Sequence, residues 1–408
     1  MQFADLHIHS KYSRATSPNM IIEELAKYAK IKGLNILGTG DFTHPLWLKE
    51  IRKKLAFVDG IYEYEGVRFV PSGEISLIYR QDGVGRRVHN VLLAPTFEVV
   101  DQINEFLLKK GRTDYDGRPI FGFSCIEMMD AFMSISKEIM VIPAHVWTPW
   151  FSLFGSMSGF DSIDECFAEH TKNIYALETG LSSDPPMNRM LSGLDRFTLV
   201  SNSDSHSPYP WRLGREANVF DLKKVDYSHL VDSIKTRRDF LFTIEVDPSY
   251  GKYHYDGHRD CNFSCAPEET KKLNGMCPVC GKKLIIGVLN RVEELADRKE
   301  SKPDEFKSLL PLSELIAFVV GGEAFSKKAN EVYDKFIARF GNEFHILLNV
   351  EKERLKDVNE RVAEMVVKNR SGGIRVEPGY DGVYGKIIDS EMPKKTYDEN
   401  KFNLKKFL

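Results

Sequence analysis

The sequence predicts an α/β protein built on a seven-unit (β/α) barrel, followed by a small zinc-ribbon-like module and a mainly helical domain. Short apolar runs alternate with helical stretches over residues 1–245. This alternation is typical of a parallel sheet, and about seven such units suit a closed barrel better than an open sheet. Four cysteines then fall within 20 residues, and the chain beyond them is charged, with apolar residues at helical spacing.

The predicted barrel strands are short, apolar and separated by turns or helices. The first strand, 3–7, leads to a helix for which Ser17 is the expected cap, Pro18 the first turn and Gly33 the end. A further helix is expected at 98–110. The remaining strands are expected at 34–39, 68–71, 88–94, 140–143, 175–177 and 197–200.

Composition and charge describe a folded protein of enzyme size. The chain has 408 residues, of which 42% are hydrophobic and 28% charged, and its formal net charge is −3. This charge gives no overall attraction to nucleic acid, so an anionic partner must be held by local patches or bound metal. No apolar run approaches the roughly 20 residues that span a bilayer, and no secretory signal precedes the first strand. We therefore expect a cytoplasmic protein with no membrane partner.

Two histidines separated by one residue open the candidate site. Because side chains alternate along a strand with period two, His7 and His9 point to the same face and can reach one metal ion. Such a pair also occurs by chance, so further groups must decide. Isolated ionisable residues follow later apolar strands in the same way, and these are Asp41, Glu74, His89, His145, Asp204 and His206.

These eight side chains together predict a site for more than one metal. Ionisable groups are costly in apolar strands unless they are paired or metal-bound, and barrel active sites lie at strand ends. Mixed imidazole and carboxylate ligands suit zinc, manganese or iron better than ions that prefer all-oxygen shells. Eight ligands exceed what one metal takes. We expect two or three divalent metals, with zinc, manganese or supplied magnesium as candidates, in an arrangement suited to phosphoryl transfer.

The clustered cysteines predict a structural zinc site. Two pairs of cysteines are separated by eleven residues, in a stretch too poor in apolar runs to form its own core. Four-thiolate sites of this kind are closed and structural rather than catalytic. His254 or His258 stays open as a replacement for one cysteine. The four expected ligands are Cys261, Cys265, Cys277 and Cys280.

The ligand pattern of residues 1–245 resembles the polymerase and histidinol phosphatase (PHP) superfamily. The shared features are the His-x-His opening, a Thr-Gly-Asp stretch, the strand glutamate, the lone strand histidines and a closing Ser-Asp-x-His. The resemblance implies a distorted barrel of seven strand-helix units with two or three metals. Many members carry Asp-His after the second strand, where this chain has Gly40-Asp41. We expect Asp41 to take the place of that histidine, and we leave His44 outside the site.

A closer resemblance, to the endonuclease Q family, extends over nearly the whole chain. It is carried by the cysteine module and by the segments 145–150, 201–207, 210–216, 251–254 and 377–385. It implies a DNA repair endonuclease, a hydrolase that cuts the phosphodiester on the 5′ side of deaminated bases (hypoxanthine, uracil) and abasic sites. The expected organisation is a barrel at 1–245, a zinc module at 246–290, a helical domain at 291–393 and a tail at 394–408.

Aromatic and basic side chains near the ligand segments are expected to contact damaged DNA. A damaged base must be accepted outside the base stack, and phosphates attract basic groups. Rim packing or solvated surface is the alternative for each residue. These candidates are Trp147, Trp150, Trp211, Lys11, Arg14, Arg212 and Arg215.

The last residues resemble the peptide by which DNA repair enzymes bind the sliding clamp. Leu404 is followed three and four positions later by Phe407 and Leu408. A frayed amphipathic end is an equally good interpretation of this spacing.

Two rival functions stay open for the chain as a whole. A small-molecule phosphatase on the same barrel would not need the zinc module and the helical extension. A non-catalytic DNA-binding scaffold would not need eight retained ligands.

Overall fold

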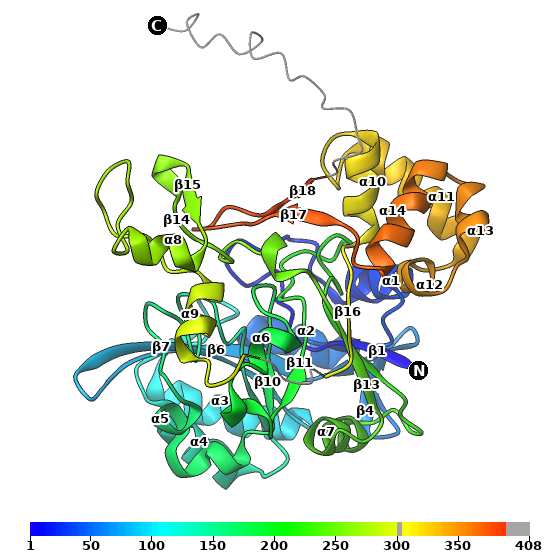
Figure 1. Cartoon of the computed structure of the whole chain (residues 1–408). Coiled ribbons are helices and arrows are strands. Elements are labelled where there is room, and N and C mark those ends of the chain that lie inside the picture. The colour runs from blue at the N-terminus through cyan, green and yellow to red at the C-terminus, as the bar shows by residue number, and fades with distance from the viewer. Residues whose placement is uncertain (300–303, 389–408) are drawn as a thin grey trace, which may run out of the picture.

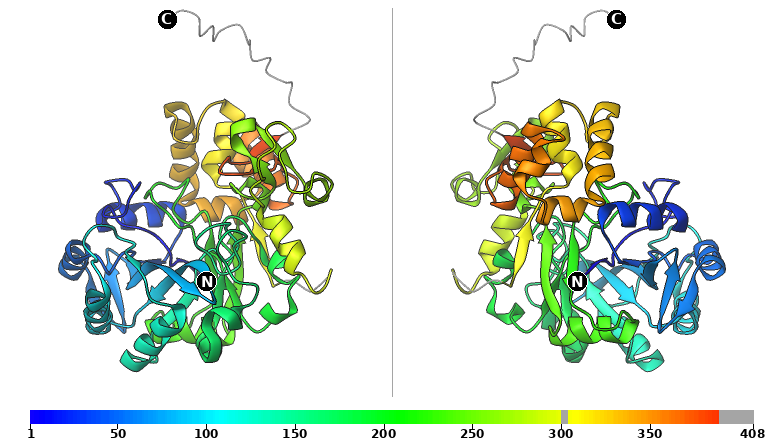
Figure 2. Two further views of the ribbon diagram at one scale, coloured as in Figure 1. Left: turned by 90° about the vertical axis from the view of Figure 1, so that its left-hand side faces the viewer. Right: turned by 90° about the vertical axis from the view of Figure 1, so that its right-hand side faces the viewer.

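The protein is described by a computed structural model over residues 1–299 and 304–388, and it has three parts (Figure 1). A large mixed α/β part carries a cysteine-containing module and a helical module, and β17 and β18 extend between the two modules. Both modules stand on the same side of the large part when the molecule is turned (Figure 2). No helix of the described residues is long and apolar enough to cross a membrane.

An eight-stranded mixed sheet forms one wall of the large part. Its order is β16-β13-β12-β1-β2-β5-β4-β3. The central strand β1 is parallel to β2 and antiparallel to β12, and β2 is parallel to β5. The strands are β1 (Gln2–Asp5), β2 (Ile36–Gly38), β3 (Ala56–Val58), β4 (Ile61–Tyr64), β5 (Val67–Val70), β12 (Ala217–Phe220), β13 (Phe240–Glu245) and β16 (Phe306–Ser308).

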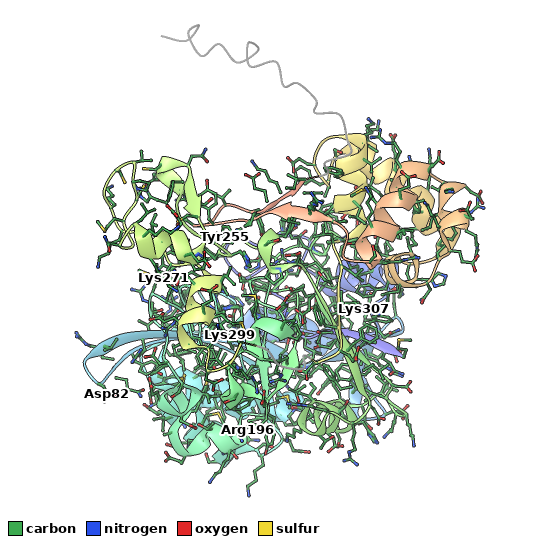
Figure 3. The ribbon with its side chains drawn as sticks, in the orientation of Figure 1. Asp82, Arg196, Tyr255, Lys271, Lys299 and Lys307 are labelled. Carbon is green, nitrogen blue, oxygen red and sulfur yellow. The ribbon has the colours of Figure 1, made fainter. Side chains whose placement is uncertain are left out.

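Two smaller sheets complete the large part. One has the order β8 (Ile120–Phe121), β6 (Ser72–Gln81), β7 (Val84–Leu93) and β9 (Met140–Pro143), and the other pairs β10 (Ala176–Glu178) with β11 (Thr198–Val200). β6 and β7 form a long hairpin whose tip, at Asp82, projects from the body (Figure 3). Asp82 and Gly83 have φ angles of 51° and 78°, the left-handed conformation that a tight two-residue hairpin turn requires.

Amphipathic helices pack against these sheets. Thr96 caps α3 by accepting a hydrogen bond from Val99, and one face of the helix buries Phe97, Val100 and Ile103. The helices of the large part are α1 (Ile22–Lys32), α2 (Pro45–Lys54), α3 (Phe97–Lys110), α4 (Cys125–Ile135), α5 (Ile163–Phe167), α6 (Pro185–Asn188) and α7 (Tyr227–Thr236), with short 3₁₀ turns at Ala168–Asn173 and Ser192–Leu194.

The two modules are built from shorter elements. The cysteine module contains β14 (Asp256–His258), β15 (Phe263–Cys265) and α8 (Pro267–Lys272), with 3₁₀ turns at Pro248–Tyr250 and Arg259–Cys261. Next come α9 (Val288–Leu295), the helical module of α10 (Leu312–Val320), α11 (Lys327–Phe340), α12 (Glu343–Leu348), α13 (Lys352–Lys356) and α14 (Glu360–Arg370), and the hairpin of β17 (Arg375–Glu377) and β18 (Lys386–Ile388).

The predicted α/β class and the alternation of strands and helices are confirmed, with differences at particular elements. α1 begins at Ile22, and Ser17 instead accepts a hydrogen bond from Met20 in a preceding turn, so the predicted cap is wrong. Gly33 ends the helix as expected, with a left-handed φ of 98°. β16 lies beyond residue 291 yet pairs with β13 of the large sheet. The start of the predicted helical domain is therefore shared with the large part.

Candidate metal centre

Side chains on strands, and on the segments that follow strands, converge on a cluster of histidines and carboxylates. Two sets of ligand atoms can be drawn, and within each set all atoms lie within 4.8 Å of one another. The first set comes from His7, His9, Glu74 and Asp204. The second comes from Glu74, His89 and His145. Glu74 belongs to both, so one carboxylate joins two candidate metal positions.

Strand register explains why these residues meet. Ser76 of β6 pairs with His89 of β7, and Glu74 lies two residues before Ser76 on β6. Glu74 and His89 therefore share a face of the sheet. His9 donates its backbone N–H to Ser205 at 2.9 Å, which brings the segment after β1 beside Asp204.

The backbone is left-handed at two of these ligands. His145 and Asp204 have φ angles of 31° and 48°, an uncommon conformation for residues with side chains. Strained backbone of this kind is concentrated at functional sites.

The two opening histidines are each held from behind by a carboxylate. His7 Nδ1 lies 3.0 Å from both carboxylate oxygens of Glu178, and His9 Nδ1 lies 3.0 Å from Asp41 Oδ1. Both rings therefore turn Nε2 toward Glu74 and Asp204. Metal-ligating histidines characteristically bond a carboxylate through the other ring nitrogen, which fixes the tautomer and the ring orientation.

One buried atom indicates that a cation fits this cluster. His7 Nε2 is buried and has no hydrogen-bond partner among the described residues. It lies 3.4 Å from Glu74 Oε2 and 3.6 Å from Asp204 Oδ1. An imidazole nitrogen without a hydrogen-bond partner among the described residues, facing two carboxylate oxygens, is a donor set that suits a divalent metal.

Electrostatics keep the carboxylates of the cluster ionised. Burial raises the pKa of Glu74, but the charges of His89, Arg118 and His7 outweigh it and hold that pKa well below its ordinary value. Burial lowers the pKa of His7, and the carboxylates of Glu178 and Glu74 outweigh it and raise that pKa well above its ordinary value. Cation binding would displace the His7 proton, since only a neutral imidazole is a ligand.

Two predicted ligands lie outside both sets. Asp41 stands behind His9, and its Oδ2 accepts hydrogen bonds from Ser10 and Ser13 side chains at 2.7 and 2.9 Å. The His206 ring is tilted against that of His9, with ring centroids 4.4 Å apart, and His206 lines the cleft in front of the cluster.

The sequence interpretation missed Glu178 and Arg118. Glu178 ends β10, so the signal that singled out Glu74, an acid at the end of an apolar strand, was present there too. Arg118 Nη1 lies 3.0 Å from Glu74 Oε2, but it follows a loop and no sequence pattern marks it.

A cleft opens in front of the cluster and receives only some of the expected DNA contacts. Trp150, Arg212 and Arg215 line it together with His145 and His206. Tyr253, Lys252 and Tyr384 also line it and were missed. Lys252 and Tyr253 lie in the segment before β14, and Tyr384 lies between β17 and β18. The sequence does not place either segment near the barrel.

The other expected contacts are placed differently. Trp147 is buried and donates its indole N–H to Asn188 at 2.8 Å, so it packs the interior and is not a stacking platform. Trp211 lines an adjoining hollow and stacks on Tyr209 at 4.8 Å.

The two basic residues near His9 are paired with acids. Lys11 Nζ lies 2.9 Å from Glu50, and Arg14 Nε lies 3.4 Å from Asp116. Neither lines the cleft.

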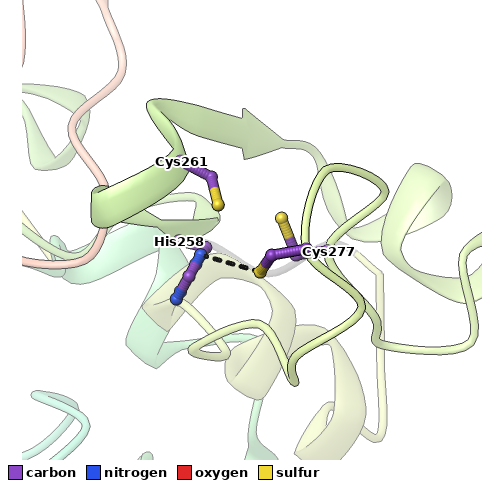
Figure 4. A group of neighbouring side chains, drawn as sticks. His258, Cys261 and Cys277 are labelled. Atoms are coloured by element: carbon purple, nitrogen blue, oxygen red, sulfur yellow. Dashed lines mark hydrogen bonds between the residues drawn. The ribbon is translucent and has the colours of Figure 1, made fainter.

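The cysteine module brings together three cysteines and one histidine. The ligand atoms of His258, Cys261, Cys277 and Cys280 lie within 4.8 Å of one another (Figure 4). Cys265 is not in this set, and its sulfur lies 3.2 Å from the Thr270 hydroxyl. β15 carries Cys265 away from the 3₁₀ turn that ends at Cys261, while the β14 residue His258 turns toward the sulfurs. Among the described residues, the candidate ligand set thus holds His258, the alternative left open, where the four-cysteine prediction has Cys265.

Leu404, Phe407 and Leu408 lie outside the described residues.

The fold and the cluster define a metal-binding α/β protein, and comparison with known proteins gives its family. The lesion-specific endonuclease PfuEndoQ from Pyrococcus furiosus is 34% identical, with a TM-score of 0.86 over 96% of both chains. An endonuclease Q solved with a 27-mer duplex carrying an abasic lesion at its active site is also 34% identical, with a TM-score of 0.87 over 97% of this chain and 99% of that one. The chain belongs to the endonuclease Q family.

Two curated proteins and one family model also match the chain, over different extents. Protein MJ0043 of Methanocaldococcus jannaschii is 34% identical over 72% of this chain, and the chain spans only 37% of the length of that relative. Protein YqxK of Bacillus subtilis is 25% identical, over 94% of this chain and 98% of that one. The family model of the MJ0043 C-terminal domain matches residues 311–373, which hold most of the helical module.

Proposed function

We propose that the protein is a metal-dependent DNA repair endonuclease that cuts the phosphodiester on the 5′ side of deaminated bases and abasic sites. One observation carries this proposal. Two ligand sets that share Glu74 face a cleft lined by aromatic and basic side chains, in a chain similar over nearly its whole length to an endonuclease bound to abasic-lesion DNA.

The large part is proposed to be a distorted barrel of PHP type. Its three sheets are joined by hydrogen bonds between strand ends: Ala94 to Pro71, Val146 to Glu178 and His9 to Ser205. These contacts link β7 to β5, β9 to β10, and the segment after β11 to the segment after β1. They support a ring of seven strand positions, which would be β1, β2, β5, β7, β9, β10 and β11.

Residues of the cluster would hold two divalent metals, one at each ligand set. Bound there, such metals lower the pKa of water toward 7 and neutralise charge on a phosphate. Glu178 and Asp41 orient His7 and His9, and Arg118 adds a fixed positive charge beside Glu74. A third metal would need ligands outside these two sets, and His206, whose ring centroid lies 4.4 Å from that of His9, is one predicted ligand outside them.

The cleft residues suit recognition of a base outside the helix. Trp150 and Tyr253 meet edge to face with ring centres 5.9 Å apart, and a base can stack on an exposed aromatic face. Arg212 and Arg215 line the same cleft and supply charge for phosphates. Lys252 lies over the Tyr384 ring at 4.6 Å and adds a further cation.

The cysteine module is proposed to bind one structural zinc through His258, Cys261, Cys277 and Cys280. Burial raises the pKa of Cys277, and the backbone N–H groups of Cys280 and Val279 outweigh it and bring that pKa to about 7. A thiol that ionises near neutral pH is a ready zinc ligand. The domain limits, the clamp-binding tail and the cytoplasmic location stay predictions.

The test is an incision assay with purified full-length protein. A labelled duplex with one abasic site, uracil or hypoxanthine is incubated with Mg²⁺, Mn²⁺ or Zn²⁺, beside an undamaged duplex and a generic phosphatase substrate. Incision 5′ to the lesion, abolished in His7→Ala/Asp204→Ala, is the expected result. Hydrolysis of only the phosphatase substrate would favour the small-molecule phosphatase, and binding without incision would favour the scaffold.

A further inference from the structure

A lysine and a glutamate form a fully buried ion pair where the helical module meets the large part. The side chains of Lys32, on α1, and Glu343, on α12, are 1% and 0% exposed, and Lys32 Nζ lies 2.7 Å from Glu343 Oε1. Removing two charges from water is costly, so a buried pair is weak evidence of added stability. Its further contacts indicate what else it does.

The lysine end of the pair fastens a loop of the cleft. Lys32 Nζ also donates to the Pro210 carbonyl at 2.8 Å. Gly214 packs so closely here that a Cβ atom would lie 3.0 Å from Lys32 Cγ. Pro210 and Gly214 both belong to a segment that we call the 209–215 loop. This loop carries Arg212 and Arg215 into the cleft and Trp211 beside it.

The glutamate end fixes the helical module against the same loop. Glu343 Oε1 accepts the backbone N–H of Leu312 at 3.0 Å, and Oε2 accepts the Tyr333 hydroxyl at 2.8 Å. Leu312 is the first residue of α10, and α10 places Glu314 at 3.5 Å from Arg212. Both ends of the pair therefore lead to the 209–215 loop, one through Pro210 and one through Arg212.

We infer that Lys32 and Glu343 are positioning residues that set the 209–215 loop for DNA, which makes the helical module part of the DNA-binding apparatus. The inference rests on the proposed function. Neither side chain lines the cleft or belongs to a ligand set. The pair therefore acts through Arg212 and its neighbours and leaves the metal cluster unchanged.

The main test removes both charges together, in Lys32→Met/Glu343→Gln. This variant avoids the unpaired buried charge that either single change leaves. With an abasic duplex, we expect KM to rise about tenfold while kcat changes by less than about twofold, since one or more phosphate contacts are lost without loss of ligands. The slope of log Kd against log salt should fall by about one.

A matched control separates positioning from simple loss of stability. Arg189 is buried at 3% exposure and pairs with Asp304, and neither residue lines the cleft. Arg189→Met should lower Tm while leaving KM and the salt slope unchanged.

Coupling to Arg212 gives a second readout. If the pair acts through Arg212, the effect of Lys32→Met/Glu343→Gln on KM should shrink in an Arg212→Ala background. Full additivity of the two effects would overturn the inference.

Hydrogen exchange tests the loop without using activity. The N–H groups of Leu213 and Gly214 are bonded to Tyr209 and Asp5, so they should exchange faster in the double variant without DNA.

Failure of the wild type to cut lesion DNA would refute the proposed function, whereas the exchange rates would still decide whether the pair holds the loop. Should the double variant not fold, Tyr333→Phe, which removes one hydrogen bond to Glu343, should shift exchange and KM in the same direction. Wild-type KM, salt slope and exchange in the folded variant would overturn the inference.

Discussion

Glu74 and Cys277 lie at the centres of two ligand clusters that are supported in opposite ways. Around Glu74, the ligands sit on a large hydrophobic core, and Glu178 and Asp41 hold the histidines from behind. Around Cys277, the module has a small core cluster of three buried residues, two of which are cysteines, and Cys280 is exposed. The first cluster is preorganised by protein contacts and faces a cleft. The second has four ligands and little else to hold its segments together.

This difference predicts different consequences of metal loss. A cluster held by its surroundings keeps its shape without metal and loses chemistry, whereas a small metal module loses its fold. Histidine combined with carboxylates would thus serve catalysis in one place, and histidine combined with thiols would serve stability in the other.

Glu74→Gln should produce the largest effect. The side chain keeps its size but loses the charge that joins the two ligand sets, so we expect kcat for abasic duplex to fall by about 10³-fold, the size found when one group that stabilises transition-state charge is removed. Single-turnover incision measures this, with metal content of the variant determined in parallel. A kcat within about tenfold of wild type would contradict a shared role for Glu74.

Glu178→Gln should have a smaller effect on the same cluster. Loss of the carboxylate behind His7 is expected to weaken metal affinity or activity by about 10- to 100-fold. Metal titration of incision rates checks this, and Asp41→Asn should behave alike because it stands behind His9. The exposed Glu169→Gln serves as the control. An effect of Glu178→Gln no larger than that of the control would mean that the second carboxylates are dispensable.

Changes in the cysteine module should affect zinc content and local folding more than chemistry. Cys277→Ser and His258→Ala are expected to lose zinc and to speed hydrogen exchange over 256–284, because metal binding supplies the folding energy of such modules. Cys265→Ser is the matched control and should retain zinc, since its sulfur bonds Thr270. Zinc analysis of the three purified variants decides. Zinc lost in Cys265→Ser and kept in His258→Ala would restore the four-cysteine site.

The last expected effect, and the smallest on incision, is on the pH dependence of stability. Burial raises the pKa of Glu245 to about 8, although the hydroxyls of Thr243 and Thr179 oppose the shift. The folded protein thus keeps a proton that the unfolded chain has lost above its ordinary pKa of 4.5. Stability from this group is full below about pH 4.5 and falls by about 1 kcal/mol per pH unit up to about pH 8.

Glu245→Gln should therefore flatten the decline of Tm between pH 5 and pH 8. Thermal unfolding of the metal-free protein measures it, with the exposed Glu305→Gln as control. A decline unchanged from wild type would show that Glu245 ionises without cost.

Residue patterns predicted most of the candidate ligands, but not which residues belong to the ligand sets and which ones bond the ligands from behind. Alternation on a strand places His7 and His9 on one face, and the buried acid Glu74 is recognisable because it interrupts an apolar strand. Asp41 and Glu178 are likewise buried acids that follow or end apolar strands. Both, however, bond Nδ1 of a histidine ring, whereas the ring's Nε2 faces Glu74 and Asp204. Distances of a few ångström between residues on different strands decide between these roles, and the spacing of residues along one strand gives no information on those distances.

Long-range placement accounts for the remaining differences. Trp147 and Trp150 stand three residues apart beside His145, but the first packs against Phe154 in the core and the second lines the cleft. Tyr384 reaches the cleft from a segment far along the chain. Cys265 satisfies the expected cysteine spacing, and the turn at Cys261 and the strand β15 carry it away from the other ligands.

Metal reconstitution of chelated full-length protein tests the central claim most directly. Divalent metal is titrated into the stripped enzyme, and 5′ incision of an abasic duplex is followed together with bound metal per chain. We predict no incision without metal. Incision should rise as the second metal of the Glu74 cluster is bound, in addition to the zinc of the cysteine module, and Glu74→Gln should not recover activity. Full incision in the chelated protein, or recovery of Glu74→Gln at wild-type metal levels, would contradict the account.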